Sequence, residues 1–469
     1  MDLTKLNLKQ AKEGLKKKDF SSVDLTKAFL QRIKEVEPKI AAFVTVAEKE
    51  ALEMAKRADG LIANGQDLPL LGVPISIKDN FSTQGIKTTA SSKVLDSYIP
   101  PYDATVVSKL KDAGIVLLGK TNMDAWAHGS STETSDYGST KNPWNIGFLP
   151  GGSSGGAAAS VAGDEVIFGI GSETAGSIRQ PASWCGVVGL KPTYGRVSRY
   201  GVIAMGSSLD CPGPITKSVE DAAIILEILA GKDHFDATTS PRQTEKYSID
   251  LNKSIRGLKI GISDDYFEGV DTQIVASVKN ALKVLEGMGA EIVHIKLFEP
   301  KYAIAVYTII QRAEVSSNLA RYDGIRFGNN REAFGEEAKR RIMFGTYALS
   351  AGYYDQFYNK ASKVRTVIIE DFKKAFQKVD VIIAPTSPST ALPLGSSKNH
   401  PMFGEMADVL VEPSSIAGLP GINVPCGFSK EGLPIGMQII GSQFSESKIL
   451  NVAYQYEQAT DWKEQKPKL

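Results

Sequence analysis

Short apolar runs alternate with helical stretches along most of this 469-residue chain, and this alternation restricts its fold more than any other feature. Runs typical of buried strands are IVLLGK, VIFGIG, LKIGIS, EIVHIK and DVIIAP. Helical patterns cover residues 272–288, 300–320, 335–352, 357–377 and 445–459. Because strands separated by helices of this length form sheets covered by helices, the pattern predicts an α/β fold.

The first sixty-five residues are predicted to be helical. Ser22 is placed to cap a helix whose apolar residues follow three- and four-residue spacing, and a second helix is expected over about 47–64. In GVPISIKDN the apolar residues alternate with polar ones, which predicts a strand running into a loop. We find no internal repeat and no low-complexity linker. We therefore predict one domain over residues 1–469, with the helices of 1–65 packed on a core of about 70–220.

Composition excludes several classes of protein. The chain is 42% hydrophobic and 23% charged, as in ordinary folded proteins. Its 54 basic and 53 acidic side chains give a net charge of +1, which argues against a large basic groove for nucleic acid. Three scattered cysteines favour a reducing compartment, and no signal sequence or membrane-length apolar run is present. We expect a cytoplasmic protein that has no contact with a membrane.

Histidine is scarce, with four residues in unrelated contexts and no spacing typical of metal ligands. We therefore predict no metal site. If the chain is a hydrolase, its base is expected to be a residue other than histidine.

The segment PGGSSGGAAASVA, residues 150–162, is the first candidate for chemistry. Its glycines permit tight turns around Ser153 and Ser154, and its alanines can begin a helix against which other backbone packs closely. It lacks the lysine of a phosphate-binding loop, so nucleotide binding is not favoured. Taken alone, such a string is most often a flexible connector.

The second candidate is GSETAGSIRQPASWCG, residues 171–186, which follows the strand-like VIFGIG. Small residues in this loop can direct several backbone N–H groups at one point, as an oxyanion hole requires. The groups in question belong to Thr174, Ala175, Gly176 and Ser177. The simpler interpretation of Ser177 is a turn or a helix cap.

Lys78, at the end of the predicted strand, is the third candidate. A lysine in that position is usually solvated. If it is buried, desolvation lowers its pKa and allows it to act as a base. Together with two serines it offers a route for protons that needs no histidine.

SIKDN, PGGSSGG and SETAGSIRQPASWCGVVGLKPT together resemble the amidase signature family, including the spacing between them. The resemblance covers most of the chain. It implies one α/β/α domain around a central mixed sheet and a Ser–Ser–Lys triad. Position by position, Ser177 would be the nucleophile, Ser153 the bridging serine and Lys78 the base, while Ser154 would not be catalytic.

Further segments are similar to the glutamine-hydrolysing, tRNA-dependent branch of this family: KPTYGRVSRYGVIAMGSSLDCPGP, SSNLARYDGIRFG, FGEEAKRRIMFGTYALSAGYYDQFY and PIGMQIIG. This similarity implies that L-glutamine supplies ammonia for converting Glu-tRNA(Gln) to Gln-tRNA(Gln). It also implies a heterotrimer with a B subunit, which would hold the tRNA, ATP and Mg²⁺, and a small C subunit. No cofactor is expected on this chain itself.

The same similarity implies that Arg341 and Asp408 grip the α-carboxylate and α-amino groups of glutamine, with Tyr307 as a further contact. Without the resemblance, the two charged residues would be interpreted as ordinary surface charges. Two other functions remain open: a free-standing amidase for small molecules, which would share the triad, and a non-catalytic scaffold subunit.

Departures from the family pattern occur close to these motifs. Ala175 stands where many members have glycine. Ala125, Trp126 and His128 stand where relatives often have Glu, Phe and Met. We interpret His128 as a packed, hydrogen-bonded histidine.

Overall fold

The computed structural model describes residues 2–326, 328–398 and 400–469. One eleven-stranded sheet runs through it in the order β1-β3-β2-β4-β6-β5-β10-β11-β9-β7-β8. The strands are β1 Phe43–Val46, β2 Pro74–Lys78, β3 Val116–Thr121, β4 Phe168–Glu173, β5 Val188–Lys191, β6 Cys211–Thr216, β7 Lys259–Ile262, β8 Glu291–His294, β9 Val381–Pro385, β10 Gly421–Phe428 and β11 Pro434–Gly441. Two parallel groups, β3-β2-β4 and β9-β7-β8, are joined by antiparallel strands. The predicted α/β fold with a mixed sheet is confirmed.

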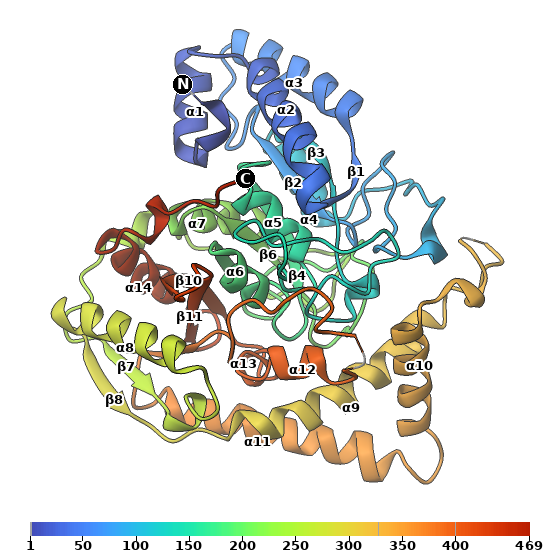
Figure 1. The fold of residues 1–469 in the computed structure, drawn as a ribbon, viewed down its shortest axis with the longest axis vertical. Coiled ribbons are helices and arrows are strands. Elements are labelled where there is room, and N and C mark those ends of the chain that lie inside the picture. The colour runs from blue at the N-terminus through green and yellow to red at the C-terminus, as the bar shows by residue number, and fades with distance from the viewer. Residues whose placement is uncertain (1, 327, 399) are drawn as a thin grey trace.

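Helices lie on both sides of this sheet (Figure 1). They are α1 Leu8–Lys17, α2 Ser22–Ile40, α3 Glu48–Ala63, α4 Thr105–Asp112, α5 Gly155–Ala162, α6 Arg179–Cys185, α7 Val219–Leu229, α8 Thr272–Gly287, α9 Pro300–Leu319, α10 Glu336–Ala348, α11 Lys360–Ala375, α12 Phe403–Ala407, α13 Glu412–Ile416 and α14 Glu446–Gln458. All five helical stretches predicted in the second half of the chain correspond to helices, namely α8, α9, α10, α11 and α14.

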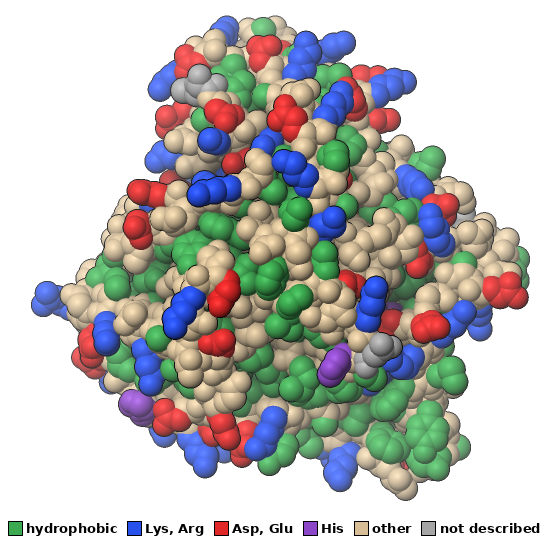
Figure 2. Space-filling view, viewed as in Figure 1, with side chains coloured by type: hydrophobic (Ala, Val, Ile, Leu, Met, Phe, Trp, Pro, Cys, Tyr) green, Lys and Arg blue, Asp and Glu red, His purple; other side chains and the backbone are tan. Residues whose placement is uncertain are grey.

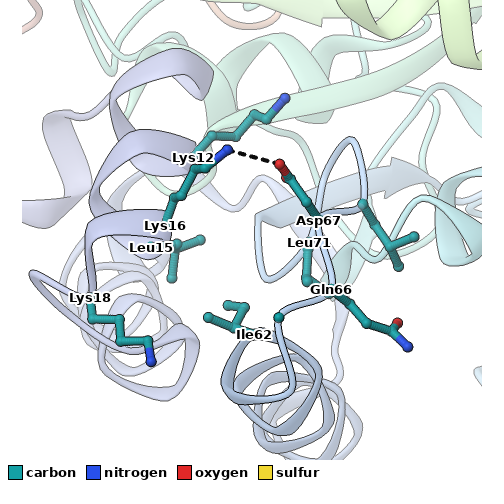
Figure 3. Close-up of a pocket in the computed structure, with 10 residues that line it drawn as sticks. Lys12, Leu15, Lys16, Lys18, Ile62, Gln66, Asp67 and Leu71 are labelled. Carbon is teal, nitrogen blue, oxygen red and sulfur yellow. Dashed lines mark hydrogen bonds and ion pairs between the residues drawn. The ribbon is translucent and has the colours of Figure 1, made fainter.

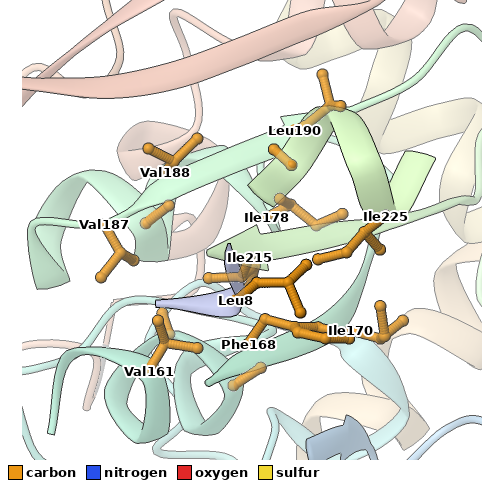
Figure 4. Close-up of a cluster of buried hydrophobic side chains, with 14 of the residues drawn as sticks. Leu8, Val161, Phe168, Ile170, Ile178, Val187, Val188, Leu190, Ile215 and Ile225 are labelled. Atoms are coloured by element: carbon orange, nitrogen blue, oxygen red, sulfur yellow. The ribbon is translucent and has the colours of Figure 1, made fainter. Parts of the chain in front are cut away.

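The central strands of the sheet are buried on both faces, whereas the edge strands β1 and β8 are partly exposed. Along β9, Val381 and Ile383 belong to one apolar cluster, and Ile382 and Ala384 belong to another. Because successive side chains of a strand point to opposite faces, the two clusters are two cores separated by the sheet. Figure 4 shows part of the first core, where side chains of β4 and β6 pack against those of α5 and α7.

The N-terminal helices pack on the β3-β2 side of the sheet, where α2 contacts both strands (Figure 1). The predicted cap of α2 is wrong by one residue. Ser21 is the N-cap: its Oγ accepts from the Asp24 N–H at 3.0 Å, and the Asp24 carboxylate accepts from the Ser21 N–H at 3.1 Å. Ser22 is instead buried, and its hydroxyl donates to the Gly72 carbonyl at 3.0 Å.

Strand β2 is buried along its whole length, although its sequence alternates. Its polar residue Ser76 lies 3.2 Å, Oγ to Oγ, from Ser160 in α5, so a hydroxyl pair replaces contact with water. The strand therefore carries Lys78, its last residue, into the interior of the protein.

Charges of both signs are interspersed on the face shown in Figure 2. Among the described residues, no helix combines the length and apolar character needed to cross a bilayer. The same residues contain no group of three or more His, Cys, Asp or Glu side chains arranged to hold a metal ion.

Candidate active site

Three neighbouring parallel strands end at one edge of the sheet. β2 ends at Lys78, β4 ends at Glu173 shortly before Ser177, and β3 ends at Thr121 before a loop that contains His128. Because the carboxyl ends of adjacent parallel strands lie together, the fold gathers these three segments into one place.

Lys78 is fully buried and directed at the serine pair. Its Nζ lies 2.7 Å from Ser153 Oγ, 2.9 Å from Ser154 Oγ and 3.1 Å from the Ser172 carbonyl oxygen. The interpretation of Lys78 as a solvated surface lysine is therefore excluded.

Burial lowers the pKa of Lys78 to about 7, because removing an ammonium from water disfavours its charged form. The carboxyl groups of Asp124, Asp210 and Glu173 act in the opposite direction and hold the pKa above what burial alone would give. A substantial fraction of the side chain is therefore a neutral amine near pH 7.

The two serines differ in how their hydroxyl protons are engaged. Ser154 Oγ donates to the Ser172 carbonyl at 3.2 Å, so its proton has an acceptor already. Ser153 Oγ has Lys78 as its hydrogen-bond partner within the described part of the chain. Of the two hydroxyls, only that of Ser153 is free to exchange its proton with the Lys78 amine.

The glycine-rich segment forms a buried, well-packed loop that leads into a helix. The peptide bond between Gly152 and Ser153 is cis, and α5 begins at Gly155. A Cβ on Gly156 would lie 2.5 Å from the backbone oxygen of Asn122, an approach that only glycine permits. The predicted close packing of backbone on this helix is confirmed, and the flexible-connector interpretation is wrong.

Ser177 is held beside the serine pair, because the Ser154 N–H donates to the Ser177 carbonyl at 3.1 Å. Ser177 Oγ makes no hydrogen bond to any described residue, which leaves its hydroxyl free to rotate toward a substrate. The backbone N–H groups of residues 174–177 likewise find no acceptor among the described residues. The Thr174 hydroxyl donates to Asp210 at 2.6 Å and fixes the start of this loop.

A buried ion pair holds the two ends of the loop of residues 174–177 together. Arg179 Nη2 lies 2.6 Å from Glu173 Oε1, and both side chains are fully buried. The other carboxylate oxygen of Glu173 accepts from the N–H groups of Ile178 and Arg179 at 3.1 and 3.0 Å. Arg179 Nη2 also donates to the Ala175 carbonyl at 3.2 Å. The pair therefore fixes the direction in which the free N–H groups point.

We expect Arg179→Met to lower the free energy of unfolding by about 3–5 kcal/mol, because it leaves the Glu173 carboxylate buried and unpaired. Urea denaturation followed by circular dichroism measures the change. Lys16→Met is the matched control, since it breaks an exposed pair in which Lys16 Nζ lies 2.9 Å from Asp67, and it should leave stability nearly unchanged. Equal stability of the two variants would contradict a structural role for the buried pair.

Arg341, Asp408 and Tyr307 are buried, so the interpretation of the two charged residues as surface charges is wrong. Arg341 lies in α10, where its Nε donates to Glu337 at 2.6 Å and its Nη1 to Gln311 at 3.0 Å. Asp408 follows α12, and Tyr307 lies in α9. Burial raises the pKa of the Tyr307 hydroxyl well above its usual value, and the positive charge of Arg341 offsets only part of this rise.

A cavity of about 420 Å³ adjoins Arg341, and both acidic and basic side chains line it. Its lining includes Arg341, Glu337, Glu405, Ser130 and His128. Ser130 links the cavity to the loop that contains Ser177. Its Oγ donates to Asp408 Oδ2 at 2.7 Å, and any side chain at Gly176 would overlap the carboxylate of Asp408. Asp408 thus lies between the wall of the cavity and the loop that contains Ser177.

Asp408 Oδ1 has no hydrogen-bond partner in the described structure. Burial raises the pKa of Asp408 well above its usual value, and the nearby Glu173 and Glu405 carboxylates raise it further. A cation bound at this oxygen would favour the ionised form again. The residue is therefore suited to a positively charged ligand group.

His128 is packed as predicted, but the expected hydrogen bond is absent. Its side chain is fully buried, and neither ring nitrogen has a partner among the described residues. Sequence reasoning also missed Asp124, which moderates the pKa of Lys78, and Ser130, which positions Asp408. Their place after the predicted strand IVLLGK was the one signal that could have identified them, since this strand, β3, lies parallel to β2.

A different cavity lies near the N-terminus, between α1 and the end of α3 (Figure 3). It is lined by lysines and apolar side chains, and its acidic residue Asp67 pairs with Lys16. None of the predicted site residues lines it.

Known proteins share this architecture. The sequence profile of the Amidase family matches residues 24–450. The A subunit of the glutamyl-tRNA(Gln) amidotransferase of Thermoanaerobacter pseudethanolicus is 53% identical over 98% of this chain and 97% of its own length. The crystal structure of the A subunit of the Thermotoga maritima glutamyl-tRNA(Gln) amidotransferase superposes with a TM-score of 0.82 at 41% identity, covering 97% of this chain and 94% of that one. A 6-aminohexanoate cyclic dimer hydrolase superposes with a TM-score of 0.90 at 26% identity, covering 100% and 99% of the two chains. The chain therefore belongs to the amidase signature family.

Proposed function

We propose that this chain hydrolyses L-glutamine and supplies the ammonia for converting Glu-tRNA(Gln) to Gln-tRNA(Gln). The observation that carries the proposal is the contact of a buried amine, Lys78, with the Ser153 hydroxyl beside a cavity of mixed charge. The amine and hydroxyls provide amide hydrolysis, and the cavity suits a zwitterionic donor. Two proteins named as the A subunit of this amidotransferase are 53% and 50% identical to the chain over 98% and 100% of its length, which supports the choice of reaction.

In the first step of the proposed reaction, neutral Lys78 accepts the proton of Ser153 as Ser153 takes that of Ser177. Ser177 Oγ then forms a bond to the side-chain amide carbon of glutamine. The resulting oxyanion accepts hydrogen bonds from the free backbone N–H groups of residues 174–177. Each such donor is typically worth about 3–4 kcal/mol in the transition state.

In the second step the C–N bond breaks as the proton held by Lys78 passes through Ser153 to the leaving nitrogen, which departs as ammonia. Water then attacks the glutamyl ester on Ser177, with the Ser153–Lys78 pair again accepting a proton. Glutamate leaves and the hydroxyl of Ser177 is restored. Atoms and protons balance without a metal or cofactor on this chain.

We assign the recognition of glutamine to the buried charged side chains of Arg341 and Asp408. Arg341 supplies N–H groups for the α-carboxylate, and Asp408 supplies an unpartnered oxygen for the α-ammonium. Tyr307 lies among the same charges, and we assign it as a further contact of bound glutamine.

We further propose a cytoplasmic heterotrimer. A B subunit would hold Glu-tRNA(Gln) together with ATP and Mg²⁺, and a small C subunit would join the two larger chains. The nearly neutral charge of this chain supports placing most contacts with the tRNA on another subunit.

The proposed function is tested by measuring ammonia release from glutamine and Gln-tRNA(Gln) formation, with and without the partner subunits and Glu-tRNA(Gln). We expect both activities in the assembled complex. Hydrolysis of simple amides without any transamidation would favour a free-standing amidase. A folded complex that releases no ammonia from glutamine would favour a scaffold subunit.

Donor selection gives a separate prediction, for which two analogues of glutamine are useful. One is 4-aminobutanamide, which lacks the α-carboxylate, and the other is 4-carbamoylbutanoate, which lacks the α-amino group. Arg341→Met should raise KM roughly ten- to hundredfold for glutamine and 4-carbamoylbutanoate only, because it removes a charge-assisted hydrogen bond. Asp408→Asn should do so for glutamine and 4-aminobutanamide only. Steady-state ammonia release measures all three donors, and equal effects on them would indicate general damage to the fold.

A further inference from the structure

His128 is a buried polar side chain that the reaction described above does not use. It follows the short helical turn Ala125–Ala127 after β3, and the residue forms part of the wall of the cavity of mixed charge. A buried imidazole whose nitrogens both lack partners is costly unless a ligand satisfies them. The ring is fully covered in this structure, and a ligand that fills the cavity would bind next to the residue.

The charges around His128 indicate which ligand group it meets. Burial lowers the pKa of the imidazole well below its usual value, and the positive charges of Arg341 in α10 and Arg312 in α9 lower it further. The ring is therefore neutral and offers one N–H donor. Both guanidinium groups are paired with carboxylates, since Arg312 Nη2 lies 2.9 Å from Glu405 and Arg341 Nε donates to Glu337 at 2.6 Å. The charges that act on the imidazole itself are nevertheless the two positive ones, so an anion is favoured over a cation beside the ring.

We propose that His128 determines donor specificity by donating a hydrogen bond from its imidazole to the α-carboxylate of bound glutamine, beside Arg341. This inference rests on the proposed function. The ammonium end of glutamine lies at Asp408, which Ser130 connects to the same cavity. The α-carboxylate then accepts one hydrogen bond from the charged guanidinium of Arg341 and one from the neutral imidazole of His128. The two bonds hold the zwitterion in one orientation.

The test compares His128→Met, which keeps a side chain of similar length without the ring nitrogens, with His128→Gln and His128→Asn, which restore an N–H donor. Each variant is assayed in the full-length chain within the assembled complex, with glutamine, 4-carbamoylbutanoate and 4-aminobutanamide. We expect the Met variant to raise KM about tenfold or more for the two carboxylate donors. Its kcat, and its KM for 4-aminobutanamide, should stay within about twofold.

Recovery of the glutamine KM in the Gln or Asn variant would support the hydrogen bond. An unchanged glutamine KM in the Met variant, or an equal rise for all three donors, would overturn the inference while leaving the proposed function intact. Because the Met variant removes an unpartnered buried polar group, it is expected to fold at least as well as the wild type. If the wild-type complex released no ammonia from glutamine, the proposed function and this inference would fail together.

Discussion

Ser177→Ala is expected to abolish glutamine-dependent formation of Gln-tRNA(Gln) while leaving formation from added ammonium intact. The hydroxyl of Ser177 is the atom proposed to form the glutamyl ester, and its loss should lower kcat for ammonia release by roughly four orders of magnitude or more. The ammonium-dependent reaction needs no ester, and we propose that it takes place on the B subunit. Both rates are measured in the same preparation of the assembled complex.

Ser154→Ala is the matched control for this variant. Ser154 also contacts Lys78, but its proton is already bonded to the Ser172 carbonyl. We expect it to retain far more glutaminase activity than Ser177→Ala. Loss of the ammonium-dependent reaction in a properly assembled Ser177→Ala complex would contradict the assignment, because it would mean that the substitution damages more than the nucleophile.

The parallel strands of the fold could be predicted from the sequence, whereas the central antiparallel strands could not. β3, β4, β7, β8 and β9 are short apolar runs next to helices, which is a local signal. β6 reads CPGPIT, and its two prolines and a glycine argue against a strand. Both prolines lie opposite residues of β4, namely Ser172 and Ile170. On the other side, β5 pairs only with the last two residues of β6, so no described strand pairs with Pro212 or Pro214 there. β10 contains Pro425 at the point where its register with β11 shifts.

The site could be predicted only in part, for a related reason. Lys78, Ser153 and Ser177 lie in motifs, and the structure brings Lys78 and Ser153 into contact. Their roles as base, bridge and nucleophile stay predictions until they are measured. The burial of Arg341 and Asp408 depends on helices from distant parts of the chain, so no local pattern distinguishes them from surface charges. The missing partner of His128 is likewise a property of the cavity and not of its neighbours in sequence.

Lys78→Arg is expected to be about as inactive as Lys78→Ala. Arginine keeps the positive charge but does not lose its proton at working pH, so it cannot act as the base. Since a general base typically contributes two to four orders of magnitude, kcat for glutamine hydrolysis should fall by roughly that factor in both variants. Steady-state ammonia release at saturating glutamine, where donor binding no longer limits the rate, measures the change.

The wild-type pH profile follows from the same assignment. Burial lowers the pKa of Lys78 to about 7, and only the neutral amine accepts a proton. kcat should therefore fall as the pH drops below about 7 and level off above it, provided that the lysine pKa in the glutamine complex stays near this value. A free lysine, with a pKa of about 10.4, would instead leave activity rising up to about pH 10.

Lys120→Arg is the matched control, because Lys120 is an equally buried lysine on the adjacent strand β3. Its Nζ is bonded to the Phe81 carbonyl at 2.7 Å and to Thr88 Oγ1 at 2.8 Å, and not to either serine of the site. The two substitutions place the same larger side chain in similarly buried positions, so thermal unfolding of both variants separates damage to the fold from loss of the base. We expect a folded Lys120→Arg variant to show the same fall in kcat below about pH 7 as the wild type. Substantial activity in Lys78→Arg would instead make Lys78 a fixed charge and would rule out proton transfer through Ser153.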